Sequence, residues 1–195
     1  MYVKYLKRFF DLVFCIFAML VFCVLMIIIG LLIKLDDNGP IFYVSNRIGK
    51  NSKIFKMIKF RSMKINAPLI LNPDGSTYNS INDPRVTRVG KFLRRTSMDE
   101  TPQIINVLKG DMSIIGPRAS LSSALETFLE DELDKMKVKP GITGFVQAYY
   151  RNSISSREKR LKDAWYANNV SFSLDLKIMI RSIFTILQGS NLFTN

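Results

Sequence analysis

The sequence predicts an α+β protein: a mostly helical compact domain with a small strand element, an N-terminal membrane helix and amphipathic interfacial helices. Three observations lead to this prediction. A long uncharged segment lies near the N-terminus, short β-rich runs alternate with charged helical stretches after it, and the last long segment is amphipathic. The 195 residues suffice for one compact domain and are too few for two of ordinary size.

The N-terminal segment from Leu12 to Ile33 contains 22 consecutive residues without a charge. As an α-helix it would reach across the hydrocarbon core of a bilayer, which is about 30 Å thick. The charged residues from Lys34 to Asp37 argue against a cleaved signal peptide. The absence of a polar stripe argues against a buried core helix. Residues 1–37 are therefore predicted to be a membrane-anchoring helix with a short basic N-terminus.

Positive charges flank this helix on both sides, because Lys4, Lys7 and Arg8 precede it and most other cations follow Pro40. Positive residues favour the cytoplasmic side, so both ends are expected there, as in a re-entrant helical hairpin. A hairpin needs a helix break, and Gly30 is the only residue of the segment that provides one. On the residues alone, a straight span and a re-entrant hairpin both remain open.

The remaining elements follow from turn signals and apolar periodicity. We expect strands at 41–44 and 54–63 with a loop at 47–51, an exposed loop at 66–84, short helices at 89–95 and 103–108, a strand at 112–115, and charged helices at 120–137 and 156–168. The segment 172–187 has an apolar side with Phe172, Leu176, Met179, Ile180, Ile183 and Leu187, and a polar side with Asp175, Arg181, Ser182 and Thr185. It would either pack on the core or lie in the membrane interface, with Lys177 and Arg181 toward the headgroups.

The formal net charge is +12, from 28 Lys and Arg against 16 acidic residues. It implies an anionic partner: a nucleic acid, a phosphate-bearing substrate or an acidic membrane. No recognition helix and no pattern of aromatic residues among cations is found, so nucleic acid is not expected. The chain has no histidine, which excludes the usual catalytic triads and most zinc sites. Catalysis must then use carboxylates, Lys, Arg, Tyr or Ser.

The adjacent carboxylates Asp99 and Glu100 are the candidate catalytic residues. Thr101 and Pro102 fit the N-cap and first position of a helix, so both carboxylates would lie where a helix dipole favours negative charge. An ionised Asp there could bind Mg²⁺ beside a phosphate, or attack phosphorus. The structural alternative is a capping box formed by Ser97 and Glu100.

Candidate phosphate-binding cations surround this pair in the sequence. Lys59 and Arg61 would share one strand face, and Arg118 follows the rigid turn Gly116-Pro117, although solvated surface cations would look the same. The turn Pro140–Gly144 could bring backbone amides to a ligand or merely reverse the chain. Further cations near the pair are Arg85, Arg88, Lys91, Arg94, Arg95 and Lys109.

Five stretches carry a resemblance to a known family: KRFFDL at 7–12, RIGKNSKIFKMIKFRSM at 47–63, NDPRVTRVGKFLRRTSMDETPQIINVLKGDMSIIGPR at 82–118, KPGITGFVQ at 139–147 and WYANNVSFSLDLKI at 165–178. With them the chain resembles the bacterial sugar transferase family, the monotopic phosphoglycosyl transferases that start membrane-bound glycan assembly. It is most similar to the small initiating enzymes of bacterial protein glycosylation. The resemblance covers nearly the whole chain.

The resemblance implies transfer of a phosphosugar from a UDP-sugar to undecaprenyl phosphate, with UMP as the second product. It implies Asp99 as nucleophile and Mg²⁺ ligand, and Glu100 as an assistant through the metal or as proton acceptor. Residues 38–195 would form the catalytic domain on the cytoplasmic side of the bacterial inner membrane, with a re-entrant helix in contact with membrane lipid. The oligomeric state stays open. The expected phosphate-binding residues are Lys59, Arg61, Arg88, Arg118 and Arg151.

Three positions differ from the family pattern. Cys23-Val24 replaces the Ser-Pro of the membrane helix, Ala119 replaces the second proline of a Pro-Arg-Pro turn, and Tyr149-Tyr150 replaces an Asn-Gly pair. The dyad Asp99-Glu100 is intact. A non-catalytic membrane scaffold of a glycosylation pathway is therefore the alternative, and the intact dyad argues against it.

Overall fold

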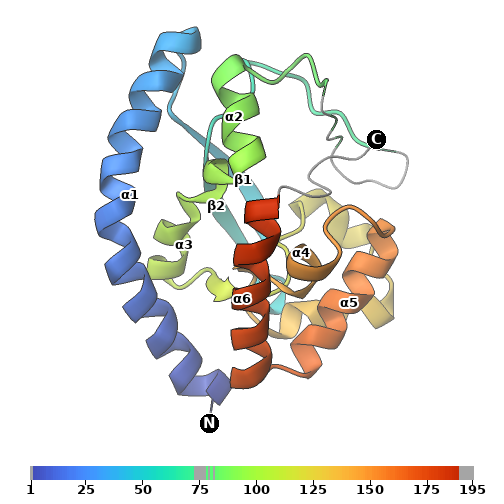
Figure 1. Ribbon diagram of the computed structural model, residues 1–195. Coiled ribbons are helices and arrows are strands. Elements are labelled where there is room, and N and C mark those ends of the chain that lie inside the picture. Colours follow the sequence, from blue (N-terminus) through green and yellow to red (C-terminus); the bar gives the residue numbers. More distant parts are fainter. Residues whose placement is uncertain (1, 73–77, 79, 81, 189–195) are drawn as a thin grey trace.

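The computed structural model describes residues 2–72, 78, 80 and 82–188. It is mostly helical with two small sheets, which confirms the predicted fold class (Figure 1). The helices are α1 (Lys7–Asp37), α2 (Arg88–Thr96), α3 (Gln103–Lys109), α4 (Phe145–Tyr149), α5 (Ser156–Asn168) and α6 (Phe172–Gln188), and the strands are β1 (Phe42–Ile48), β2 (Ile54–Phe60), β3 (Ser113–Ile115) and β4 (Gly141–Thr143). Short 3₁₀ segments occupy Lys50–Ser52, Met98–Glu100, Ser122–Thr127 and Glu130–Lys137.

The first sheet is an antiparallel hairpin whose turn is shorter than expected. Arg47 and Ile48 belong to β1, because they pair with Phe55 and Ile54, whereas the sequence prediction placed them in a loop. The chain reverses at residues 49–53, with Asn51 in the left-handed region at φ 53°. Directly opposed residues of an antiparallel pair point to the same face, so Arg47 shares a face with Lys59 near the other end of the hairpin.

Strand β2 ends at Phe60 and does not continue to Met63 as predicted. Arg61 turns instead toward the end of α1, where its guanidinium pairs with Asp37 and its Nε donates to the carbonyl of Pro40 at 2.6 Å. Arg61 and Lys59 therefore do not share the strand face expected from their spacing. The predicted loop 66–84 follows, and its residues 73–77, 79 and 81 lie outside the described part.

The charged segment 120–137 does not form the predicted α-helix. It forms two 3₁₀ segments separated by Phe128 and Leu129, whose backbones are extended. Glu132 accounts for this conformation, because its side chain is fully buried and accepts hydrogen bonds from Arg160 and from the backbone amide of Leu129. A buried carboxylate requires such partners, and they hold this segment against α5.

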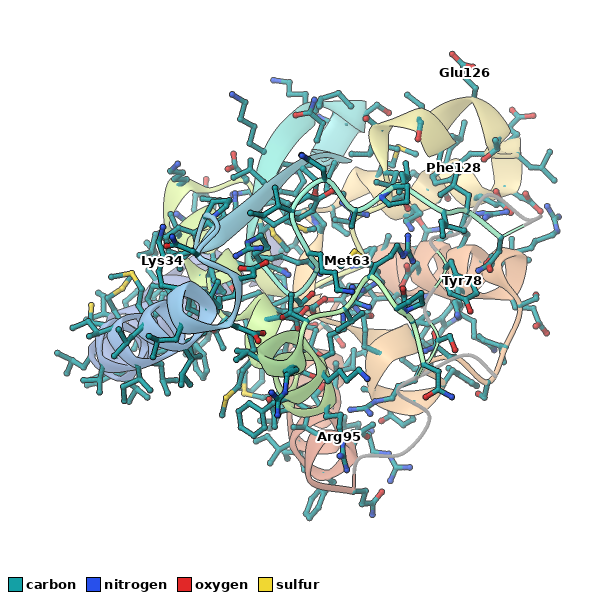
Figure 2. All side chains as sticks on the ribbon, turned by 90° about the horizontal axis from the view of Figure 1, so that it is seen from above. Lys34, Met63, Tyr78, Arg95, Glu126 and Phe128 are labelled. Atoms are coloured by element: carbon teal, nitrogen blue, oxygen red, sulfur yellow. The ribbon has the colours of Figure 1, made fainter. Side chains whose placement is uncertain are left out.

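Helix α1 packs one narrow stripe on the body and exposes the rest of its apolar surface. The stripe consists of Asp11, Cys15, Phe22, Ile29, Gly30 and Ile33. Outward residues such as Leu20 and Leu35 are 75% exposed, so a buried core helix does not describe this element. By length and composition, α1 could cross a membrane. Figure 2 shows it at one side of the molecule, with its side chains projecting outward.

Helix α1 runs without interruption from Lys7 to Asp37, so it contains no hairpin turn. Gly30 does not break it; Gly30 lies inside the helix, where a Cβ would be 3.1 Å from Ile41. Both ends of the helix contact the same body. Near the start, Asp11 accepts from the backbone amide of Ile114 at 2.9 Å, and near the end the carboxylate of Asp36 accepts from the backbone amide of Val89 at 3.0 Å.

Helix α6 turns its polar side inward. Asp175, Ser182 and Thr185 are buried with Ile178, whereas six large apolar side chains are 46–56% exposed: Phe172, Leu176, Ile180, Ile183, Phe184 and Ile186. The buried polar groups have partners, since Asp175 accepts from Tyr166 at 2.6 Å and Thr185 donates to the carbonyl of Ala148 at 2.9 Å. The helix therefore packs on the core, as one of the two alternatives predicted, but it does so through Ile178, Met179 and its polar side, while most of its predicted apolar side faces outward.

Candidate active site

The two candidate carboxylates lie in a tight turn between α2 and α3. Helix α2 ends at Thr96, its C-cap Ser97 adopts the left-handed conformation at φ 58°, and Met98–Glu100 then form one 3₁₀ turn. Pro102 stands at the N-cap of α3, and the Thr101 hydroxyl donates backward to the carbonyl of Met98 at 2.9 Å. Thr101 is therefore not the N-cap. Helix α3 has only seven residues.

The predicted capping box between Ser97 and Glu100 is not formed, because Glu100 points toward two cations. Its Oε1 accepts from Lys59 Nζ at 2.5 Å and from Arg118 Nη2 at 3.2 Å. Burial alone would raise the pKa of Glu100, but Lys59 and Arg118 outweigh burial and lower that pKa to about 2. Glu100 is thus a carboxylate locked between cations, and it is a weak base.

Asp99 differs from its neighbour in having no hydrogen bond or ion pair with any residue that the structure describes. Desolvation by burial, reinforced by the charge of Glu100, raises the pKa of Asp99 to about 6. Lys59, Arg94 and Arg118 act in the opposite direction and favour its ionised form. The two adjacent carboxylates therefore have pKa values pushed in opposite directions, a pattern typical of catalytic pairs.

Arg118 is positioned by two backbone turns that pack directly against each other. A Cβ on Gly116 would lie 2.4 Å from the carbonyl oxygen of Lys139, and one on Gly144 would lie 2.0 Å from the carbonyl oxygen of Gly116. The amide of Arg118 donates to the buried carboxylate of Asp163 at 3.2 Å. The glycines of the 140–144 turn thus allow close packing around the segment that carries Arg118.

The five expected phosphate-binding cations are distributed unevenly. Lys59 and Arg118 meet at Glu100, whereas Arg61 is buried in its ion pair with Asp37. Arg88 is exposed at the first position of α2, and Arg151 follows α4 with φ 48°. Roles for Arg61, Arg88 and Arg151 in phosphate binding stay predictions.

A small pocket beside the dyad contains residues that the sequence did not single out. Lys59, Glu100 and Arg118 line it together with Arg47, Met57, Gln103, Ala119 and Gly141. Arg47 was assigned to a loop, and strand pairing brings it to this pocket. The signal that could have found it is its alternation with Lys59 once the hairpin register is known.

The dyad fits a Mg²⁺ ion that is shared with a substrate. Magnesium prefers carboxylate oxygens and commonly takes only one or two of them, with water and substrate phosphates completing its octahedron. Within the described part of the chain, no group of three or more acidic, Cys or His side chains forms a closed metal cage. The oxygens of Asp99 have no hydrogen-bond or ion-pair partner among the described residues, so Asp99 with Glu100 could hold such an ion. When bound, Mg²⁺ would offset phosphate charge.

Comparison with known proteins identifies sugar transferases as relatives over nearly the whole chain. The family model described as bacterial sugar transferase matches residues 2–189. The chain is 36% identical over 196 residues to the undecaprenyl-phosphate galactose phosphotransferase of Salmonella typhimurium, covering 95% of this chain and 41% of the relative. It is 37% identical over 191 residues to the UDP-N-acetylgalactosamine-undecaprenyl-phosphate N-acetylgalactosaminephosphotransferase of Aeromonas hydrophila, covering 95% of this chain and 44% of the relative.

A shorter relative matches over most of its own length. An uncharacterized sugar transferase of Bacillus subtilis is 38% identical over 183 residues, which cover 93% of this chain and 87% of that protein. The chain thus spans about two fifths of the length of the first two relatives and most of the third.

Proposed function

Because the chain belongs to the bacterial sugar transferase family, we propose that it transfers a sugar 1-phosphate from a UDP-sugar to undecaprenyl phosphate. The products are undecaprenyl-diphosphate-sugar and UMP, and the step opens the assembly of a membrane-bound glycan. The names of two relatives support the substrate class. The observation that carries the proposal is the Asp99 carboxylate, which has no partner in the described part of the chain and whose ionised form is favoured by Lys59, Arg94 and Arg118.

Asp99 is the nucleophile in the proposed mechanism. Its ionised carboxylate attacks the sugar-bearing phosphorus, a new P–O bond forms, and the bridging P–O bond to the α-phosphate breaks with its electron pair leaving on UMP. An oxygen of the polyprenyl phosphate then attacks the same phosphorus and releases the Asp99 carboxylate. Lys59 and Arg118 stabilise the phosphate charge in both steps.

Glu100 acts by position in this mechanism. With its pKa lowered to about 2, it is a poor acceptor for a proton from the polyprenyl phosphate. Its ion pairs with Lys59 and Arg118 hold both cations toward the reacting phosphates. The family resemblance implies that Glu100 assists through the metal or accepts a proton, and the lowered pKa of Glu100 argues against proton acceptance.

The raised pKa of Asp99 predicts the pH dependence of turnover. An ordinary Asp has a pKa of about 3.9 and is largely ionised at pH 5, whereas Asp99 would be largely protonated at that pH. We expect kcat/KM to rise with pH, to reach half its maximum at about 6 and to level off about one pH unit higher. Initial rates of UMP release in a buffer series of constant ionic strength would measure this rise, which is the acid limb of the pH profile.

The variant Glu100→Gln identifies the group responsible for the limb. It removes a like charge that raises the pKa of Asp99, so the limb of the residual activity should move to lower pH. A limb that stays in place, or that moves to higher pH, would show that another group controls ionisation.

We propose that α1 and α6 both face lipid, with the body on the cytoplasmic side of the bacterial inner membrane. Both ends of α1 contact the body, which favours one membrane side for both ends and argues against a straight span. The outward apolar side of α6 is a second lipid-facing surface. Its exposed cations Lys177 and Arg181 would lie near anionic headgroups.

A single tryptophan on α6 would test this placement. In a Trp165→Phe background, Ile183→Trp should fluoresce and be strongly quenched by brominated lipids in reconstituted vesicles, because Ile183 is 56% exposed on the outward side. The matched control is Glu126→Trp, which Figure 2 places on the other side of the molecule from α6. Equal quenching of both variants, or quenching of Glu126→Trp alone, would contradict the placement.

A metal-dependent assay tests the activity itself. Purified protein is incubated with Mg²⁺ and a panel of UDP-sugars, with and without undecaprenyl phosphate, while UMP release and intact protein mass are followed. UMP release that depends on one sugar donor would support the transferase and identify that donor. Absence of release with every donor, in protein shown to be folded, would favour the alternative of a non-catalytic scaffold.

A further inference from the structure

Arg47 belongs to the same pocket as the dyad, and the hairpin register puts it there. It pairs with Phe55, while Lys59 pairs with Tyr43, so the side chains of Arg47 and Lys59 lie on one face of the hairpin. Both line the pocket beside Glu100 and Arg118. Strand β1 therefore contributes a cation to a site whose other cations come from β2 and from the turn after β3.

The guanidinium of Arg47 is held in place by neutral groups. Its Nε donates to the hydroxyl of Ser45 at 3.2 Å, and its Nη1 lies 3.4 Å from the carbonyl oxygen of Ala119. No carboxylate forms an ion pair with Arg47 within the described residues, in contrast to Lys59, Arg61 and Arg118. A half-buried guanidinium without an acidic partner has donors available for an anionic ligand.

The charges around Arg47 also favour an anion in the pocket. Burial, followed by repulsion from Arg118, lowers the pKa of Arg47 to about 10, and Glu100 offsets only part of this. Lys59 and Arg118 already share the single carboxylate of Glu100. A bound phosphate would relieve the repulsion between the two guanidinium groups, and Arg is suited to hold its oxygens with two parallel donors.

The cations of the site differ in whether they line the pocket beside Glu100. Arg47, Lys59 and Arg118 line the pocket together with Glu100, whereas Arg94, whose charge favours the ionised form of Asp99, is not among the residues that line it. Lys59 and Arg118 act on both carboxylates. A diphosphate that presents one phosphorus to Asp99 would then place its second phosphate beside Lys59 and Arg118, on the Arg47 side.

We propose that Arg47 binds the α-phosphate of the UDP-sugar, which becomes the phosphate of the leaving UMP. This assignment depends on the proposed transferase function. When Asp99 attacks and the bridging P–O bond breaks, the electron pair stays on the α-phosphate. The guanidinium groups of Arg47 and Arg118 stabilise the additional negative charge there. Arg47 is thus a leaving-group ligand, and it makes no bond to the sugar phosphate that is transferred.

Ligand binding to the full-length purified protein tests this without turnover. Titration calorimetry with UMP and, by competition, with uridine is compared for wild type, Arg47→Ala and Arg47→Gln. We expect UMP to bind about tenfold or more weakly to both variants while uridine binding is unchanged, because only UMP carries the phosphate. The control Lys56→Ala removes one charge from the opposite face of the same hairpin and should leave UMP affinity within about twofold.

Each outcome separates the assignment from the proposed function. Unchanged UMP affinity in folded Arg47→Ala and Arg47→Gln, judged by their melting temperatures, overturns the assignment. Equal weakening of UMP and uridine also overturns it, because the effect would then concern the nucleoside or the fold. If UMP binding depends on Arg47 but wild type transfers no sugar, the α-phosphate site stands as a UMP site and the transferase function fails.

Discussion

Asp99→Asn is expected to abolish the phosphosugar adduct and to lower sugar-phosphate transfer by about three orders of magnitude or more. The amide has the same shape as the carboxylate but cannot attack phosphorus as an anion. Because Asp99 has no partner among the described residues, its replacement breaks no hydrogen bond there and should leave the fold intact. Intact-mass spectrometry after incubation with the UDP-sugar alone measures the adduct, and UMP release measures the rate.

The matched control for this variant is Glu126→Gln, which neutralises an exposed carboxylate on the 3₁₀ segment Ser122–Thr127, outside the pocket lining. It should form the adduct and release UMP as wild type does. An adduct that persists in Asp99→Asn would assign the nucleophile elsewhere. A transfer reaction that proceeds at the wild-type rate without any adduct would contradict the two-step mechanism.

Lys59→Met is expected to lower kcat/KM by about 100-fold. Lys59 is the strongest charge acting to lower the pKa of both Asp99 and Glu100, and its ammonium lies 2.5 Å from Glu100. Methionine keeps much of the unbranched apolar stem and removes the charge. Two effects add in this variant: the phosphates lose a cation, and the pKa of Asp99 rises further, so the acid limb of the pH profile should move to higher pH.

Lys56→Met provides the control for Lys59→Met. Lys56 is exposed on the opposite face of the same strand, so its replacement removes an equal charge without touching the site. We expect its kcat/KM to stay within about twofold of wild type. Equal losses in the two variants would mean that the general positive charge of the hairpin matters, and that Lys59 makes no specific contact with the reacting phosphates.

Helix positions were predicted well, because apolar spacing and capping residues are local properties. The segment 156–168 forms a helix with the predicted ends, and 89–95 and 103–108 each lie within a helix. The segment 120–137 was predicted wrongly, since Glu132 is buried through partners on α5 that spacing cannot reveal. The predicted end of strand β2 was wrong for the same reason, because Arg61 leaves the strand to form an ion pair with the distant residue Asp37.

By itself, the sequence determined the long apolar helix, the amphipathic C-terminal helix, the adjacent carboxylates and the absence of histidine chemistry. Only the tertiary structure decided how these parts are used. Lys59 and Glu100 are 41 positions apart and meet because a hairpin packs beside a turn. The inward side of α6 is polar because Asp175, Ser182 and Thr185 find hydrogen-bond partners on the body. Local spacing sets which residues share a face; the partners that satisfy their charges come from distant segments.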